Sequence, residues 1–435
     1  MRRPVRPSIS IGEETNMVSR HLSRRLLIAA AVGVAAFVIG QSGESRAQSA
    51  SAPVRLTIAN SQWVDALRGK NLWNAVLKYQ AVAPNVHLEQ EAIPSAEFDN
   101  KMTTAFGAGQ GPDIAMMQEG LFYSIADAGF LADLSAAVAG VKNLNKTNDN
   151  GVVNGKRLGV AWQRAVYALI YNKPLVDKAG AKVPTDVEGL IASAKTVMSA
   201  TAAIGFTSRH QMADYIGWFM DFQNWAYGYG VKWTDGTGKL TIDTPEAVAA
   251  FTAFKKMYDA KIIPIGDDFP TQRTRFKEKQ VAFSIDNSGG TLNIASGGAL
   301  AAKDLYAAPL PFPHPGAHQQ IFVVVNARSK NQKAAVDFVK WLVGPDGQQA
   351  LRDASGPDAL ATDVPVTEVF RAANPWADTF AELAVNSRST LIPGHEVDTP
   401  QIMRFVMQAL ERVVLAGADP KTALTEAQRQ IDRTF

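Results

Sequence analysis

Cysteine is absent from the 435 residues of the sequence. Its absence excludes disulfide bonds, thiolate catalysis and iron–sulfur clusters, because all three require cysteine sulfur. It also excludes the lipid-modified cysteine that tethers some exported bacterial proteins. Any stability or chemistry of this chain therefore comes from packing, hydrogen bonds and charges.

Long apolar runs are also scarce, and the clearest one, Leu26–Gly40, has only 15 residues. A membrane-spanning helix needs about 20. The run follows Arg20, Arg24 and Arg25, and a small, polar stretch that ends in Ser45–Ala47 comes after it. A basic start, a short apolar run and small residues before a cleavage point are typical of an export signal. We therefore expect residues 1–47 to be removed and the mature protein to work in the periplasm.

Two details of this export segment stay open. The paired arginines in Ser23–Leu27 favour the twin-arginine route, with the general secretory route as the alternative. Residues 1–16 are long and acidic for a signal start, so Met17 is a candidate initiator alongside Met1.

An excess of positive charge is missing once the leader is set aside. The whole chain has 44 basic and 41 acidic residues, and residues 1–47 hold seven Arg and three Glu, which leaves 37 basic and 38 acidic residues. A nucleic-acid-binding domain needs a basic surface. We therefore expect no nucleic-acid partner. The protein is also expected to be a monomer in solution.

The familiar catalytic and cofactor motifs are absent too. The sequence has no His-Glu-x-x-His zinc helix, no Gly-x-Ser-x-Gly elbow and no phosphate-binding loop. Pro315 and Gly316 separate the neighbouring His314 and His318 and prevent a helical metal-binding face. The acidic pair Asp267–Asp268 lies between turn-forming residues and is interpreted as a solvated turn. We expect no cofactor, no metal and no catalytic residues.

Strands and helices alternate in the first part of the mature chain. Residues 54–60, 85–93 and 113–118 are expected strands, and helices are expected over residues 68–82 and around residues 98–106. This order predicts an α/β fold with parallel strands and helices on both faces.

The rest of the chain adds a second unit. Residues 159–171 form a long extended run, residues 281–285 and 321–325 are expected strands, and residues 245–261 form an amphipathic helix. About 388 residues remain after the leader, which is too many for one ordinary core and favours two lobes.

Several motifs together resemble the extracellular solute-binding proteins of ABC importers, in the sugar-binding family that includes maltose-binding protein. They run in the family's order and together span nearly the whole mature chain: Phe106–Ile114 with its Gly-Pro-Asp, Gly155–Trp162, Tyr167–Leu175 with its Tyr-Asn-Lys, Lys330–Leu342, and Ala423–Ile431.

The resemblance implies a type II periplasmic-binding-protein fold, with two sheets flanked by helices and joined by a hinge of crossing strands. Lobe one is expected to comprise residues 48–158 and 311–346, and lobe two residues 159–310 and 347–435. The implied function is capture of a small solute, with a carbohydrate favoured, by lobe closure and its delivery to the membrane permease subunits of an ABC importer. A periplasmic polysaccharide-processing enzyme and a binding protein for a polyol phosphate or polyamine stay as alternatives.

The resemblance also places the ligand contacts in loops that follow particular strands. Planar amide, carboxylate and guanidinium groups and aromatic rings bind sugars well. The expected ligand-binding residues are Gln62, Trp63, Gln118, Glu119, Trp162, Arg164, Tyr215, Asn287, His395 and Glu396. At Asn287 the chain departs from its relatives, which often carry an aromatic platform after a glycine there.

Eight aromatic residues lie between Tyr215 and Trp233. Several of them recur at helical spacing, and such a stripe usually packs into the core. Only Tyr215, at the expected helix start, is kept as a ligand candidate.

Overall fold

The computed structural model describes residues 53–435, which belong to one compact unit. The expected export signal (residues 1–47), its paired arginines and Met17 lie outside the described residues. Among the described helices, none is both long enough and apolar enough to cross a membrane.

The strands follow the sequence pattern closely. They are β1 (Val54–Asn60), β2 (Val86–Ala92), β3 (Ile114–Gln118), β4 (Val152–Val153), β5 (Lys156–Arg157), β6 (Val160–Asn172), β7 (Ile204–Thr207), β8 (Val281–Asn287), β9 (Leu305–Ala308), β10 (Ala317–Val325) and β11 (Arg388–Ser389). The three strands expected first in the chain are confirmed as β1, β2 and β3, and the long extended run is β6.

The main sheet is mixed. Its order is β2-β1-β3-β10-β6-β8-β7, with β9 paired to β6 and β11 paired to β10. Strands β2, β1 and β3 run parallel, as the strand–helix alternation predicts. Strand β10 enters beside β3 in the antiparallel direction, which the local pattern does not reveal.

Two strands pass through both halves of this sheet. The first half of β6, from Val160 to Val166, pairs with β10, and its second half, from Tyr167 to Asn172, pairs with β8 and β9. Residues Ile321–Val325 of β10 pair with β3, whereas its start, Ala317, pairs with β11. These are the expected crossing strands, and they hold the two halves together through backbone hydrogen bonds.

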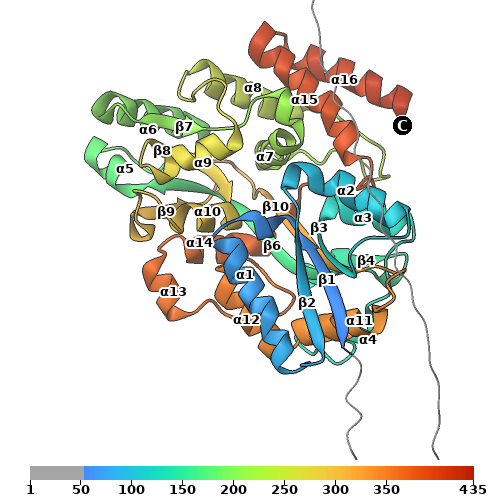
Figure 1. The fold of residues 1–435 in the computed structure, drawn as a ribbon. Helices are drawn as coiled ribbons and strands as arrows, with labels where there is room; N and C mark the ends of the chain where they lie inside the picture. Colours follow the sequence, from blue (N-terminus) through green and yellow to red (C-terminus); the bar gives the residue numbers. More distant parts are fainter. Residues whose placement is uncertain (1–52) are drawn as a thin grey trace, which may run out of the picture. The chain divides into compact units, whose positions relative to one another are not determined.

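Helices cover both faces of the sheet (Figure 1). The α-helices are α1 (Arg68–Leu77), α2 (Ser95–Gly107), α3 (Glu119–Asp127), α4 (Ser135–Val138), α5 (Lys173–Ala179), α6 (Val187–Thr201), α7 (Tyr215–Gly228), α8 (Pro245–Asp259), α9 (Phe269–Lys277), α10 (Ser288–Ala295), α11 (Gln332–Leu342), α12 (Pro345–Ser355), α13 (Glu368–Ala373), α14 (Ala377–Leu383), α15 (Thr399–Ala416) and α16 (Pro420–Thr434). The 3₁₀ turns are η1 (Ser61–Val64), η2 (Lys78–Ala81), η3 (Lys146–Gly151), η4 (Met212–Asp214), η5 (Ala302–Asp304) and η6 (Ala384–Asn386).

Helix starts coincide with side chains that cap the free backbone N–H groups of the first turn. The side chains of Asp186, Thr244, Asp268 and Asp419 accept hydrogen bonds at the starts of α6, α8, α9 and α16. Proline follows three of these caps, where its missing N–H costs no hydrogen bond. Asp419 and Pro420 thus form the start of the last helix.

The core has one apolar cluster on each face of each half-sheet. Along β3, Ile114 and Met116 join the cluster with α1 and α11, whereas Ala115 and Met117 join the cluster with α2 and α3. This alternation is what a strand buried on both faces requires. Helices α7, α8, α15 and α16 share the larger cluster of the second half, and Figure 1 shows them grouped together.

The aromatic stripe of α7 belongs to this core, as its spacing predicts. Trp218, Phe222 and Trp225 are fully buried, and their rings meet Phe254 edge-on or tilted. Trp233 is also buried, and its indole N–H donates to Gln223 Oε1 at 2.7 Å. These aromatics hold the lobe together and are closed to a ligand.

The division into lobes stays a prediction. The core beside β1 and β3 also includes Leu351, Leu360 and Ala361. Their packing favours a boundary for lobe one later than the expected residue 346.

Candidate functional site

The carboxyl ends of β1, β3 and β8 carry polar side chains. Strand β1 ends at Asn60, whose side chain accepts from the N–H of Gln62 at 2.9 Å and so starts the turn η1. Gln118 ends β3, and Asn287 ends β8 and caps α10 by accepting from the N–H of Gly290 at 2.8 Å. In open α/β sheets, ligands bind beyond these strand ends.

The crossing strands complete this polar region. Ile321 of β10 pairs with Gln118 on one side and with Gln163 of β6 on the other, so the two glutamines share one face of the sheet. Gln319, two residues before Ile321, lies on that face as well. We call Gln62, Gln118, Gln163, Asn287 and Gln319 the strand-end site.

A chain of hydrogen bonds connects one side of the strand-end site. Gln62 Nε2 donates to Gln163 Oε1 at 2.7 Å, and the indole N–H of Trp162 donates to Gln62 Oε1 at 2.9 Å. Gln163 Nε2 then donates to Ser355 Oγ at 2.9 Å. The structure therefore brings together the predicted residues Gln62 and Trp162, which are distant in sequence.

The predicted Trp63 lies beside them but turns into the core. It is 7% exposed, and its indole N–H donates to the carbonyl of Ile58 at 3.2 Å. Its ring meets Trp73 and Trp162 edge-on, at 5.3 and 6.2 Å between ring centres. The buried Trp63 ring therefore packs η1 against the core.

The other side of the strand-end site joins Asn287 to β10. Asn287 Nδ2 lies 3.5 Å from Gln319 Oε1, and Gln319 Nε2 donates to the Tyr167 hydroxyl at 2.5 Å. Gln319 and Tyr167 are absent from the predicted set. The alternation along β6 from Gln163 to Tyr167 is the signal that would have found Tyr167.

Arginine–carboxylate pairs surround the end of β8, and no sequence pattern predicts them. Arg273 binds Asp286 through two hydrogen bonds, at 2.8 and 2.7 Å. Arg209 Nε lies 3.1 Å from a carboxylate oxygen of Asp221. Burial raises the pKa of Asp221 to about 7, and the nearby Arg209 opposes this shift.

Glycines make room for these arginines. A Cβ placed on Gly290 would lie 1.9 Å from Arg273 Nη2, and one on Gly217 would lie 1.6 Å from Arg209 Nη1. No larger residue fits at either position without displacing the guanidinium group.

The predicted Glu119 opens α3 and reaches the segment that follows β11. It is 4% exposed, and its Oε1 accepts from Thr390 Oγ1 at 3.2 Å, while Oε2 makes no hydrogen bond within the described residues. Burial raises the pKa of Glu119 to about 7, although bonds from Ser389 and Thr390 and the charge of Arg164 act in the opposite direction. The Glu119 carboxyl group therefore has a pKa close to neutral pH.

The predicted Arg164 lies on the opposite face of β6 from Gln163. It pairs with Gln320, and its Nε and Nη2 donate to Gln320 Oε1 at 3.2 and 3.0 Å. His318, on the same face, is 3% exposed, and its Nδ1 is 2.9 Å from Ser387 Oγ. Burial, aided by the charge of Arg164, lowers the pKa of His318 to about 3, so this ring is neutral.

The remaining predicted residues lie at the edges of lobe two. Tyr215 is half-buried at the start of α7, with the Arg404 guanidinium 5.8 Å from its ring centre. His395 Nε2 is 3.0 Å from the carbonyl of Gly238, and Glu396 Oε1 accepts from the N–H of Gly394 at 3.0 Å. None of these contacts reaches the strand-end site, and their ligand roles stay predictions.

The interpretation of Asp267–Asp268 as a solvated turn is only partly right. Asp268 caps α9, but Asp267 pairs with Arg275 at 2.7 Å, and its side chain is 10% exposed. No group of three or more His, Asp or Glu within residues 53–435 is arranged to hold a metal ion.

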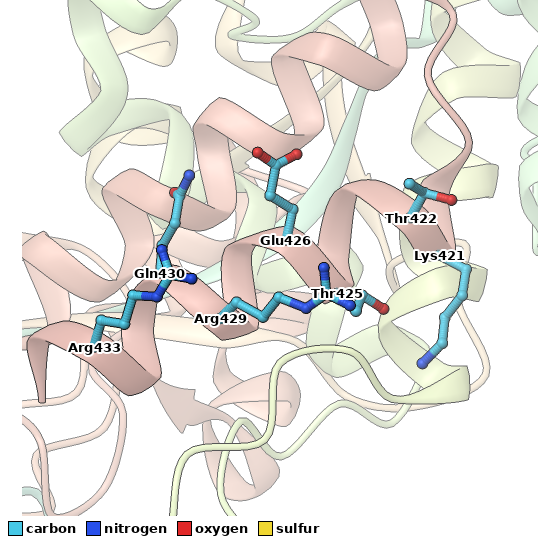
Figure 2. Close-up of a pocket in the computed structure, with 7 residues that line it drawn as sticks. All are labelled: Lys421, Thr422, Thr425, Glu426, Arg429, Gln430 and Arg433. Carbon is cyan, nitrogen blue, oxygen red and sulfur yellow. The ribbon is translucent and has the colours of Figure 1, made fainter.

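A pocket of about 490 Å³ lies elsewhere, along α16 (Figure 2). Its described lining comes from this one helix and consists of Lys421, Thr422, Thr425, Glu426, Arg429, Gln430 and Arg433. It contains no residue of the strand-end site. A smaller pocket of about 220 Å³ includes Tyr167 and the turn Pro309–Ala317, beside β10.

Comparisons with known proteins identify the family of this chain. Residues 65–349 match the family described as bacterial extracellular solute-binding protein. A binding protein of Brucella abortus (strain 2308) is 25% identical over 52% of this chain, and the match spans only 55% of that relative's length. A protein of Deinococcus radiodurans, named a probable ABC transporter-binding protein, is 25% identical over 65% of this chain and 70% of its own.

Solved structures show the same fold. Maltose-bound MalE3 of T. maritima superposes with a TM-score of 0.76 at 21% identity and covers 88% of this chain and 100% of its own. An ABC transporter solute-binding protein of Agrobacterium radiobacter K84, in complex with ribitol, gives 0.71 at 20% identity and covers 88% and 99%. The chain therefore has the two-lobed fold of MalE-like binding proteins.

Proposed function

Because the chain belongs to the family of bacterial extracellular solute-binding proteins, we propose that it is the solute-capturing subunit of an ABC importer. It holds a small, uncharged carbohydrate between its lobes and delivers it to the membrane permease subunits. It works as a monomer in the periplasm, after removal of residues 1–47, and catalyses no reaction.

This proposal depends mainly on one observation. The ends of strands from both halves of the sheet meet at the crossing strands β6 and β10. Gln62 and Gln118 follow strands of lobe one, Asn287 follows a strand of lobe two, and β6 and β10 contact all three through Gln163, Ile321 and Gln319. Rotation about these strands would open or close the space between the lobes, and a ligand that binds both sides favours the closed state.

The charges argue against a phosphate-bearing solute. Three arginines near the strand-end site each have a carboxylate partner: Arg68 with Asp358, Arg209 with Asp221, and Arg273 with Asp286. A phosphate site needs an excess of arginine, and this region has none, because Asp65 and Asp214 add two carboxylates to the three paired ones. Amides dominate the strand-end site, and they donate and accept hydrogen bonds as sugar hydroxyls do.

The predicted ligand contacts differ in how well their positions support the proposal. Gln62, Gln118 and Asn287 belong to the strand-end site and are the strongest candidates. Glu119 is second to them, because it lies at the neighbouring strand end with an unpaired buried oxygen. The other predicted residues make contacts within the protein and have weaker support. They are Trp63, Trp162, Arg164, Tyr215, His395 and Glu396.

Thermal unfolding of residues 48–435 against a panel of solutes tests the function. The panel contains sugars, polyols, sugar phosphates, amino acids and polyamines. A ligand at about 100 times its dissociation constant stabilises a protein by about 2.7 kcal/mol, a readily visible shift. A carbohydrate that raises the midpoint and is recovered unchanged supports the proposal. Conversion of the carbohydrate would indicate the polysaccharide-processing enzyme, and a response to charged solutes alone would overturn the carbohydrate assignment.

A further inference from the structure

We infer that Arg68 limits the captured solute to about one sugar ring or a short polyol, by closing one end of the strand-end site. This inference rests on the proposed function and specifies the size of its ligand. It makes Arg68, in the first turn of α1, a specificity-determining residue.

Arg68 is held between the two halves of the molecule. Its Nη2 lies 3.4 Å from Asp358 Oδ2 and 3.3 Å from Gln163 Oε1, and its side chain is 15% exposed. Asp358 has a fully buried side chain and also accepts from the Ser288 hydroxyl at the start of α10. One arginine thus connects α1, a crossing strand and, through Asp358, α10 of lobe two.

The backbone of α10 is shaped around this arginine. A Cβ on Gly289 would lie 2.8 Å from Arg68 Nη2, a distance that real Cβ atoms do not adopt. The guanidinium group of Arg68 lies against Gly289, and the missing Cβ leaves room for it.

A second contact closes the same end. Asn293 of α10 donates to Asp65 Oδ2 at 2.7 Å, just before α1 begins. Asn293 and Asp65 therefore already have protein partners at this end of the site.

An additional sugar ring at this end would have to break these contacts. Separating the Arg68–Asp358 pair would leave a buried carboxylate without its partner, which is costly. At the other side of the site, Gln118 is exposed, and Asn287 and Gln319 are only partly covered, so hydroxyls of a single ring have partners there.

Calorimetric titration of residues 48–435 with a length series tests the limit. The series contains monosaccharides, five- and six-carbon polyols, and the di- and trisaccharides built from the same sugars. We expect the unmodified protein to bind its best monosaccharide or polyol at least about tenfold more tightly than any longer member, a difference of about 1.4 kcal/mol. Arg68→Ala should bring the two affinities within about threefold of each other.

Two further variants make the result specific. Asn293→Ala removes the second contact without touching the Arg68 ion pair, and it should reduce the preference in the same direction even if Arg68→Ala fails to fold. Arg55→Ala is the matched control, because Arg55 is exposed and pairs with Glu89 on the outer face of lobe one. It should leave the preference unchanged.

The outcomes separate the two proposals. A disaccharide or trisaccharide that binds the unmodified protein as tightly as its monosaccharide overturns the size limit but keeps the carbohydrate function. An unchanged preference in both Arg68→Ala and Asn293→Ala overturns the role of this closed end. Binding of no uncharged solute of any length overturns the proposed function and the size limit with it.

Discussion

Replacing Glu119 by Gln should make the protein more stable at alkaline pH and leave its stability at acidic pH nearly unchanged. Glu119 is buried, and its pKa is raised from an ordinary value of 4.5 to about 7. A carboxyl group with a raised pKa contributes stability that is fully present below the unfolded pKa and is lost as pH rises through the folded pKa. Glutamine keeps the acceptor for Thr390 and carries no charge.

The magnitude follows from the size of the pKa shift. At about 1.4 kcal/mol per pKa unit, the rise from 4.5 to about 7 corresponds to about 3 kcal/mol. Most of this difference should appear between about pH 5, where the buried carboxyl is protonated, and about pH 8, where it is ionised. At the higher pH the Gln variant should therefore exceed the unmodified protein in unfolding free energy by about 2–3 kcal/mol.

Urea unfolding followed by tryptophan fluorescence at the two pH values measures this difference. Glu97→Gln is the matched control, because Glu97 also lies in the first turn of a helix but is exposed. The same free-energy difference between Glu119→Gln and the unmodified protein at both pH values would refute the reasoning, since it would show that Glu119 does not change its charge in this range.

Three further predictions use the same urea assay. His318→Gln should reduce the loss of stability as pH falls below about 6.5. Burial lowers the pKa of His318 to about 3 in the folded protein, so the histidine stabilises the folded state above its unfolded pKa of about 6.5 and this contribution is lost as pH falls. An unchanged dependence of the unfolding free energy on pH below about 6.5 would contradict this. Asp286→Asn should cost about 3–5 kcal/mol, because it removes one partner of the buried pair with Arg273, and a loss below about 1 kcal/mol would argue against the pair. Leu410→Ala, fully buried in α15, should cost about 2–5 kcal/mol, whereas Leu415→Ala on the same helix, 60% exposed, should cost about 0.5 kcal/mol or less.

Local patterns were sufficient for most of the secondary structure. Strand β1, the buried strand β3 and the amphipathic helix α8 are found where alternation and helical spacing place them. The aromatic stripe of α7 lies in the core, as its helical spacing predicts, because the period of a helix face is visible in the sequence itself.

The site was less accessible to sequence reasoning. Gln62 and Gln118 can be proposed from the sequence, because they lie at or just after the ends of strands, a position that the sequence shows. The pairs of Arg209 with Asp221 and Arg68 with Asp358 depend on how distant segments pack, and no local pattern encodes that. Gln319 lies before the expected strand at residues 321–325, and only the structure shows that β10 begins earlier, at Ala317.

The crossing strands also have a consequence for how the chain folds. Strand β10 lies between β3 and β6, although it comes far later in the sequence than either. Until residues 317–325 are available, both neighbours present open backbone edges, which are prone to wrong pairing. Neither lobe is thus a contiguous segment that can finish folding alone, and such long-range pairing is slow. The nascent polypeptide therefore stays incompletely folded until residues 317–325 have emerged, and a fragment that ends before β10 should aggregate.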